Sequence, residues 1–145
     1  DGNLWVGDVG QELWEEVIVV KKGGNYGWSG REGSHAFGNR EAAKNVSKQL
    51  EPVWEYDHQI GKSITGGRVY NASRVPQLTG KYLYADYVTG SIWALHYDAE
   101  NDKLISNEQV VPESVAVLAF GEDQHGEVYY LTNSSRGESI YRFAK

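Results

Sequence analysis

The sequence predicts an all-β fold made of repeated four-stranded antiparallel units. Three observations lead to this prediction: 17 of the 145 residues are glycine, the chain contains 10 Tyr and 5 Trp, and one glycine-led pattern recurs along it. Glycine permits the tight turns that join short strands, and aromatic side chains favour strands. This composition suits helices poorly.

The glycine-led pattern occurs three times, and each copy begins a predicted hairpin. A short apolar or aromatic run follows the glycine, a small polar residue lies six positions after it, and a second β-rich run comes next. Two more predicted strands lie where the inner strand of a four-stranded unit belongs. The paired runs are 2–8 with 16–20, 80–86 with 91–95, and 126–132 with 139–143; the inner strands are 63–70 and 115–120.

The spacing of the pattern indicates a β-propeller. Gly80 and Gly126 are 46 residues apart, within the roughly 40 to 50 residues of a propeller blade. Gly2 and Gly80 are 78 residues apart, which predicts one blade and an insertion at about 22–52. The stretch 41–45 is the one candidate helix. We interpret 1–145 as a single partial β-propeller domain of about three blades, the first incomplete at its N-terminus.

Three blades do not close a ring, because propellers have four to eight. An open array leaves blade faces and a sheet edge uncovered. A second copy of this chain, giving a six-bladed ring by two-fold pairing, or the N-terminal half of a longer propeller would cover them. We therefore expect the isolated chain not to be a monomer.

Composition excludes several classes of function. Hydrophobic residues are 40% and charged residues 23%, which is typical of a folded globular domain. No apolar run approaches the roughly 20 residues of a membrane span, and the first residues contain no targeting signal. The net charge of −6 disfavours nucleic acid and anionic membranes as partners. The absence of cysteine excludes disulfides, thiolate metal sites and a cysteine nucleophile.

Three motifs identify a family resemblance. The segments 2–11, 14–17 and 22–28, the last containing Gly-Gly-Asn-Tyr-Gly-Trp, resemble the glucose/sorbosone dehydrogenase family. The segments 63–70 and 120–129 also resemble the related hedgehog-interacting-protein-like propellers. The resemblance implies the C-terminal half of a six-bladed aldose dehydrogenase that uses pyrroloquinoline quinone with calcium. It also implies a sugar substrate and a periplasmic or secreted location.

The resemblance implies metal ligands in the first hairpin and the loop after it. The matching positions are the backbone carbonyls of Gly10 and Gln11, the carboxylate of Glu16, and Tyr26 through its carbonyl. Calcium takes six to eight oxygen ligands and accepts such a mixture of carboxylate and carbonyl. A glycine-rich loop can turn its carbonyls toward one point.

The resemblance also implies quinone contacts in two later segments. The second segment lacks the Arg or Lys that the family commonly places there, which leaves Arg68 as a source of positive charge. Arg68 lies one step out of phase with Thr65 and Gly67 along the strand, so we expect it to face the other way. The implied cofactor positions are Thr65, Gly66, Gly67, Arg68, Val88, Thr89 and Gly90.

No catalytic residue is assigned, because the family's histidine base belongs to the N-terminal half and none of His35, His58, His96 and His125 matches it. Two functions stay open: half of a quinone-dependent sugar dehydrogenase that contributes calcium and cofactor contacts, or a non-catalytic module that self-assembles or binds a partner through its open blade edges.

Several residues have an alternative structural interpretation. Glu15 and Glu16 are either solvated turn charges or, at Glu16, a metal ligand. Asp57 and His58 are either an acid–base pair or, more in keeping with their position, turn residues. The aromatic rings at 26 and 28 are expected to pack rather than bind ligand through their side chains. An aromatic stripe is expected in the core between blades: Trp5, Tyr82, Tyr84, Trp93 and Tyr129.

Overall fold

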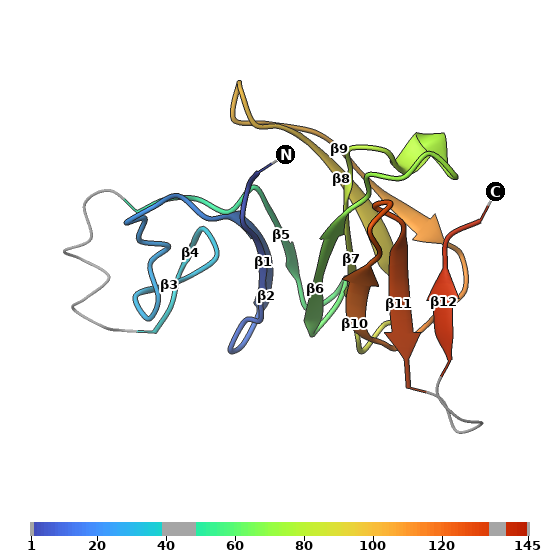
Figure 1. The fold of residues 1–145 in the computed structure, drawn as a ribbon. Helices are drawn as coiled ribbons and strands as arrows, with labels where there is room; N and C mark the ends of the chain where they lie inside the picture. Colours follow the sequence, from blue (N-terminus) through green and yellow to red (C-terminus); the bar gives the residue numbers. More distant parts are fainter. Residues whose placement is uncertain (1, 39–48, 134–138, 145) are drawn as a thin grey trace.

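The computed structural model describes residues 2–38, 49–133 and 139–144. Within these ranges the chain forms strands and one short 3-10 helix, η2 (Pro76–Leu78), and has no α-helix. Three antiparallel sheets stand side by side, as Figure 1 shows. This confirms the predicted all-β, propeller-type architecture. The candidate helix at 41–45 lies outside the described residues.

The first sheet has the strand order β1-β2-β5. Its strands are β1 (Trp5–Asp8), β2 (Trp14–Val19) and β5 (Trp54–Asp57). A two-stranded hairpin, β3 (Arg31–Glu32) and β4 (His35–Ala36), lies within the predicted insertion. In Figure 1 this hairpin lies beside β1 and β2, on the side away from β6.

The second sheet is the one four-stranded blade among the described residues, with the order β6-β7-β8-β9. Its strands are β6 (Ile64–Val69), β7 (Tyr82–Asp86), β8 (Ile92–Asp98) and β9 (Lys103–Val111). The third sheet has the order β10-β11-β12, with strands β10 (Val117–Glu122), β11 (Val128–Thr132) and β12 (Ile140–Arg142). The predicted inner strands at 63–70 and 115–120 are β6 and β10.

A β-bulge in β6 changes which residues share a face. Thr65 pairs with Ala85 and Arg68 pairs with Leu83, so β6 has one more residue than β7 between these pairs. Ala85 and Leu83 are two apart in β7 and lie on one face, which places Thr65 and Arg68 on that face together. The expectation that Arg68 faces away from Thr65 is therefore wrong, because it assumed an uninterrupted strand.

Apolar side chains fill the two spaces between the sheets. Between the first and second sheets, Trp5 stacks on Tyr82 with ring centroids 4.6 Å apart, and Tyr84 stacks on Trp93 at 5.2 Å. Between the second and third sheets, Leu83, Ala85 and Ile92 pack in one buried cluster with Val117, Val128 and Tyr130. These clusters hold the three sheets in fixed relation, which positions the turns at their ends.

Candidate metal pocket at the first hairpin

The four predicted metal positions lie in one pocket of about 330 Å³. We call it the acidic pocket, because three carboxylates line it. The turn between β1 and β2 provides one wall, and the loop that leads into the β3–β4 hairpin provides the other. Its lining residues are Asp8, Val9, Gly10, Gln11, Glu16, Tyr26, Trp28, Arg31 and Glu32.

Glu16 and Glu32 are buried carboxylates, 6% and 4% exposed. Glu16 accepts a hydrogen bond from the Gly33 amide, in the turn of the β3–β4 hairpin. Burial, followed by the charge of Asp8, raises the pKa of Glu16 to about 7, although the Gly33 amide opposes this shift. Buried carboxylates that repel one another favour either a proton or a cation.

Glu32 shapes the turn that carries Gly10 and Gln11. Its Oε1 accepts the Glu12 amide at 2.6 Å, and both of its oxygens lie 3.2 Å from the Leu13 amide nitrogen. A Cβ at Gly10 would lie 1.8 Å from the Trp14 carbonyl oxygen and 2.7 Å from Glu32 Oε1. Only glycine therefore fits at this position in the turn.

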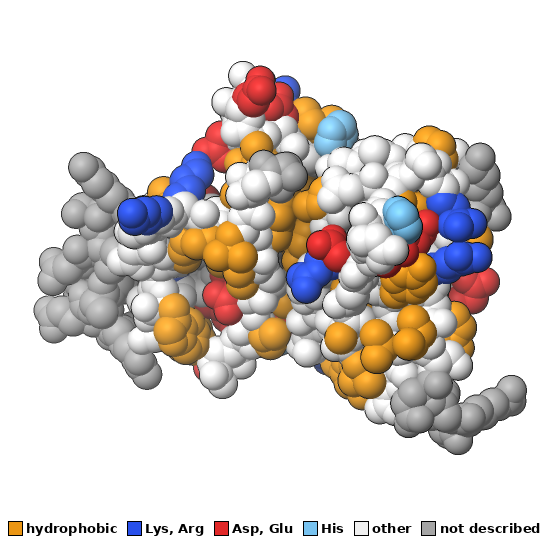
Figure 2. Space-filling view, in the orientation of Figure 1, with side chains coloured by type: hydrophobic (Ala, Val, Ile, Leu, Met, Phe, Trp, Pro, Cys, Tyr) orange, Lys and Arg blue, Asp and Glu red, His pale blue; other side chains and the backbone are white. Residues whose placement is uncertain are grey.

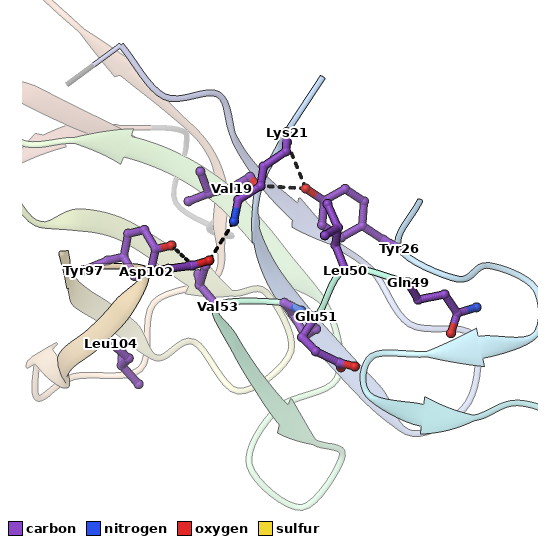
Figure 3. Close-up of a pocket in the computed structure, with 11 residues that line it drawn as sticks. Val19, Lys21, Tyr26, Gln49, Leu50, Glu51, Val53, Tyr97, Asp102 and Leu104 are labelled. Carbon is purple, nitrogen blue, oxygen red and sulfur yellow. Dashed lines mark hydrogen bonds and ion pairs between the residues drawn. The ribbon is translucent and has the colours of Figure 1, made fainter. Parts of the chain in front are cut away.

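The Tyr26 hydroxyl makes hydrogen bonds to the backbone of the protein itself. The hydroxyl donates to the Val19 carbonyl at 2.9 Å and accepts the Lys21 amide at 2.9 Å. Figure 3 shows these contacts at a second pocket, of about 440 Å³, which the 2.7 Å ion pair between Lys21 and Asp102 borders. The phenol of Tyr26 is thus structural, and its carbonyl is the group left to consider as a ligand.

The expected quinone positions do not gather in one pocket. Thr65 donates to the Val117 carbonyl at 3.0 Å, and Gly67 donates its amide to the Tyr82 hydroxyl at 2.8 Å. Arg68 lines a separate pocket of about 240 Å³, together with Asn3 and Trp5. Its guanidinium lies 3.3 Å from the Gly67 carbonyl oxygen.

The turn between β7 and β8, 87–91, is organised by one buried carboxylate. Asp86 Oδ1 accepts the amides of Val88 at 3.0 Å and Thr89 at 2.8 Å, and the Thr89 hydroxyl at 3.1 Å. The Gly90 amide bonds to the Asp86 carbonyl at 2.9 Å. The donors of this predicted cofactor loop are therefore used inside the protein.

Two structural interpretations from the sequence need correction. Glu15 and Glu16 are both buried rather than solvated, because they lie in a strand between packed layers. His58 follows β5, as expected of a turn residue, but its Nε2 lies 3.0 Å from Glu15 Oε1. Sequence reasoning assigned no contact between sheets to Glu15 or Asp86. Asp86 is the polar residue six positions after Gly80 in the repeated pattern, but the pattern does not show which residues it contacts.

Within the described ranges, no three His, Asp or Glu side chains form a metal-binding group by themselves. A metal in the acidic pocket would therefore need backbone carbonyls, as the expected ligand set contains. The same ranges contain no helix with the length and hydropathy of a membrane span.

Comparison with known proteins agrees with the motifs. The family model described as glucose/sorbosone dehydrogenase matches residues 1–142. The chain belongs to this family. HIPL1 protein of Arabidopsis thaliana is 30% identical over 169 aligned residues, covering 95% of this chain and 24% of that protein.

Two solved structures share the fold of this family member. A glucose dehydrogenase has a TM-score of 0.73 at 17% identity, covering all of this chain and 41% of that one. The PQQ-bound aldose sugar dehydrogenase of Streptomyces coelicolor has a TM-score of 0.66 at 15% identity, covering 95% of this chain and 38% of that one. The chain thus spans between about a quarter and two fifths of these relatives.

Proposed function

We propose that this chain is the calcium-holding half of a quinone-dependent sugar dehydrogenase propeller and supplies no catalytic base. The observation that carries the proposal is the acidic pocket, in which Gly10, Gln11, Glu16 and Tyr26 lie together. Buried carboxylate and carbonyl oxygens are the ligands that calcium prefers. The periplasmic or secreted location that the family resemblance implies is part of this proposal.

The residues present fit calcium better than they fit the quinone. The glycine-only turn at Gly10 and the crowded charge around Glu16 suit a hard divalent cation. A cofactor with three carboxylates needs cations and free donors. The donors of Val88 and Thr89 are already used, and Arg68 lies in another pocket. These residues therefore do not form a binding site for the quinone by themselves.

Calcium is expected to raise the melting temperature of this chain. Binding to the folded state alone stabilises it by roughly 2.7 kcal/mol at one hundred times Kd, which is several degrees for a domain of this size. The measurement is thermal unfolding with and without millimolar calcium. Glu16→Gln removes a charged ligand and should abolish the rise, whereas Glu100→Gln, in an exposed turn, should keep it.

An unchanged melting temperature for the wild type in calcium would reject the metal site, and so would an equal rise for Glu16→Gln. With glucose, pyrroloquinoline quinone and an artificial acceptor, we expect no turnover. Turnover that disappears in Glu16→Ala would contradict the proposed lack of a base.

The second candidate function, a module that associates through an open blade face, is favoured by the third sheet. In the third sheet Leu131 pairs with Ile140, and the equivalent pair in the second sheet is Ala85 with Ile92. Ala85 and Ile92 are 0% exposed beneath the third sheet, whereas Leu131 is 37% and Ile140 is 70% exposed. Figure 2 shows hydrophobic side chains gathered over this sheet.

We propose that a further propeller blade covers this face, and for the isolated chain that blade comes from a second copy. The expected result from light scattering at micromolar concentration is a mass above the 16.2 kDa of one chain. A single-chain mass would contradict the proposal.

A further inference from the structure

Two buried carboxylates hold the start of the inner strand β6, at Ser63 just before the strand and at Ile64, its first residue. Asp86 Oδ2 accepts the Ser63 amide at 2.7 Å, and Glu15 Oε2 accepts the Ile64 amide at 2.8 Å. Both carboxylates are 0% exposed. They come from different sheets, since Glu15 lies in β2 and Asp86 ends β7. We call Glu15 and Asp86 the carboxylate clamp.

The clamp is well satisfied by hydrogen bonds. Besides its contacts in the β7–β8 turn, Asp86 accepts the Tyr56 hydroxyl at 3.1 Å. The remaining oxygen of Glu15 contacts His58 Nε2 at 3.0 Å. A buried charge is costly unless such partners surround it, and charge-assisted hydrogen bonds are stronger than neutral ones. The clamp therefore fixes two consecutive amides, at the entry to β6 and at its first residue, with strong, directional contacts.

The clamp also connects the acidic pocket to the second sheet. Consecutive residues of a strand point to opposite faces, so Glu16 reaches the acidic pocket while Glu15 reaches β6 on the other face. The same β6 residue, Ile64, pairs with Asp86. A shift of β6 would therefore be transmitted through Glu15 to β2, the strand that carries Glu16.

We propose that Glu15 is a positioning residue for the calcium site, holding β2 against β6 so that Glu16 and the β1–β2 turn keep their binding geometry. Asp86 supports Glu15 by holding the preceding Ser63 amide and the Tyr56 hydroxyl of β5. This inference rests on the proposed calcium function. Contacts beyond a metal's own ligands commonly change affinity by roughly 10- to 100-fold when removed.

Calcium titration by calorimetry and amide hydrogen exchange test the proposal. Glu15→Ala should weaken calcium binding by about tenfold and speed exchange of the Ile64 amide, whereas Glu15→Gln keeps an acceptor and should largely restore both. The matched control is Glu127→Ala. Glu127 is 5% exposed and also has two partners, Tyr70 and Arg74, but it lies at the other flank of the second sheet. Its loss should lower stability and leave calcium affinity unchanged.

Equal calcium affinity in Glu15→Ala and wild type, or equal weakening in Glu127→Ala, would overturn the proposal. If Glu15→Ala does not fold, His58→Ala removes the other partner of Glu15, and a smaller loss of affinity is expected. If wild type binds no calcium, the proposed function fails, and exchange alone decides on the clamp. Faster exchange at Ser63 in Asp86→Asn and at Ile64 in Glu15→Ala then supports the clamp, and unchanged exchange rejects it.

Discussion

Glu15 and Glu16 illustrate what one residue step means in a β-strand. Side chains alternate between faces, so these neighbours lie in different surroundings. Glu16 contacts the β3–β4 hairpin through the Gly33 amide, and Glu15 contacts the next sheet through the Ile64 amide. The same type of side chain therefore has two roles, one at a candidate ligand position and one between sheets.

Asp86 should make the stability of the protein depend on pH at the acid end. Burial raises the pKa of Asp86, but the hydrogen bonds from Thr89 and Ser63 outweigh it, and the folded pKa lies below the ordinary 3.8. A lowered folded pKa stabilises the protein above the unfolded pKa, and this stability disappears as pH falls through the folded value.

Urea unfolding at pH 7 and at pH 2 checks this sign. Wild type should lose more of its free energy of unfolding than Asp86→Asn across that interval. Glu100→Gln, in an exposed turn, should behave like wild type. A wild-type loss no larger than that of Asp86→Asn would show that Asp86 does not contribute in this way.

At the scale of elements, the β1–β2 turn depends on close approach rather than on sequence propensity. We expect Gly10→Ala to destabilise the protein by roughly 2 to 4 kcal/mol, since its Cβ would overlap the Trp14 carbonyl. Gly121→Ala is the matched control, because no atom lies within 4 Å of its added Cβ. Equilibrium unfolding compares the two, and equal stability would mean that the turn relaxes freely.

The predicted elements differ from the observed ones for local reasons. The hairpins and inner strands were predicted because glycine and apolar runs mark them. β9 (Lys103–Val111) was not predicted, because polar residues such as Ser106 and Asn107 interrupt its alternation at the edge of the blade. β5 was not predicted either, because it follows the long insertion and the spacing of the glycine-led pattern gives no information there. The bulge in β6 has no sequence signal beyond Gly66 and Gly67.

At the scale of the whole molecule, the exposed face of the third sheet is the surface through which we propose that the chain associates. We expect Ile140→Glu to reduce the mass in solution to a single chain, since a charge on this face opposes packing against another blade. Ile105→Glu is the control, because Ile105 is also exposed, at 50%, but lies in β9 rather than on this face. Light scattering of both variants decides, and dissociation by Ile105→Glu as well would point to unspecific association.

Composition and repeat spacing were enough to predict the class of fold, and the motifs were enough to predict the family. Both are predicted from short stretches of sequence, because turns and strands depend mainly on neighbouring residues. The tertiary structure decided that the four expected ligand positions share a pocket, that Arg68 turns to the face of Thr65, and that two strand carboxylates hold β6. These depend on packing between sheets and on a one-residue bulge, which bring together residues that lie far apart in sequence.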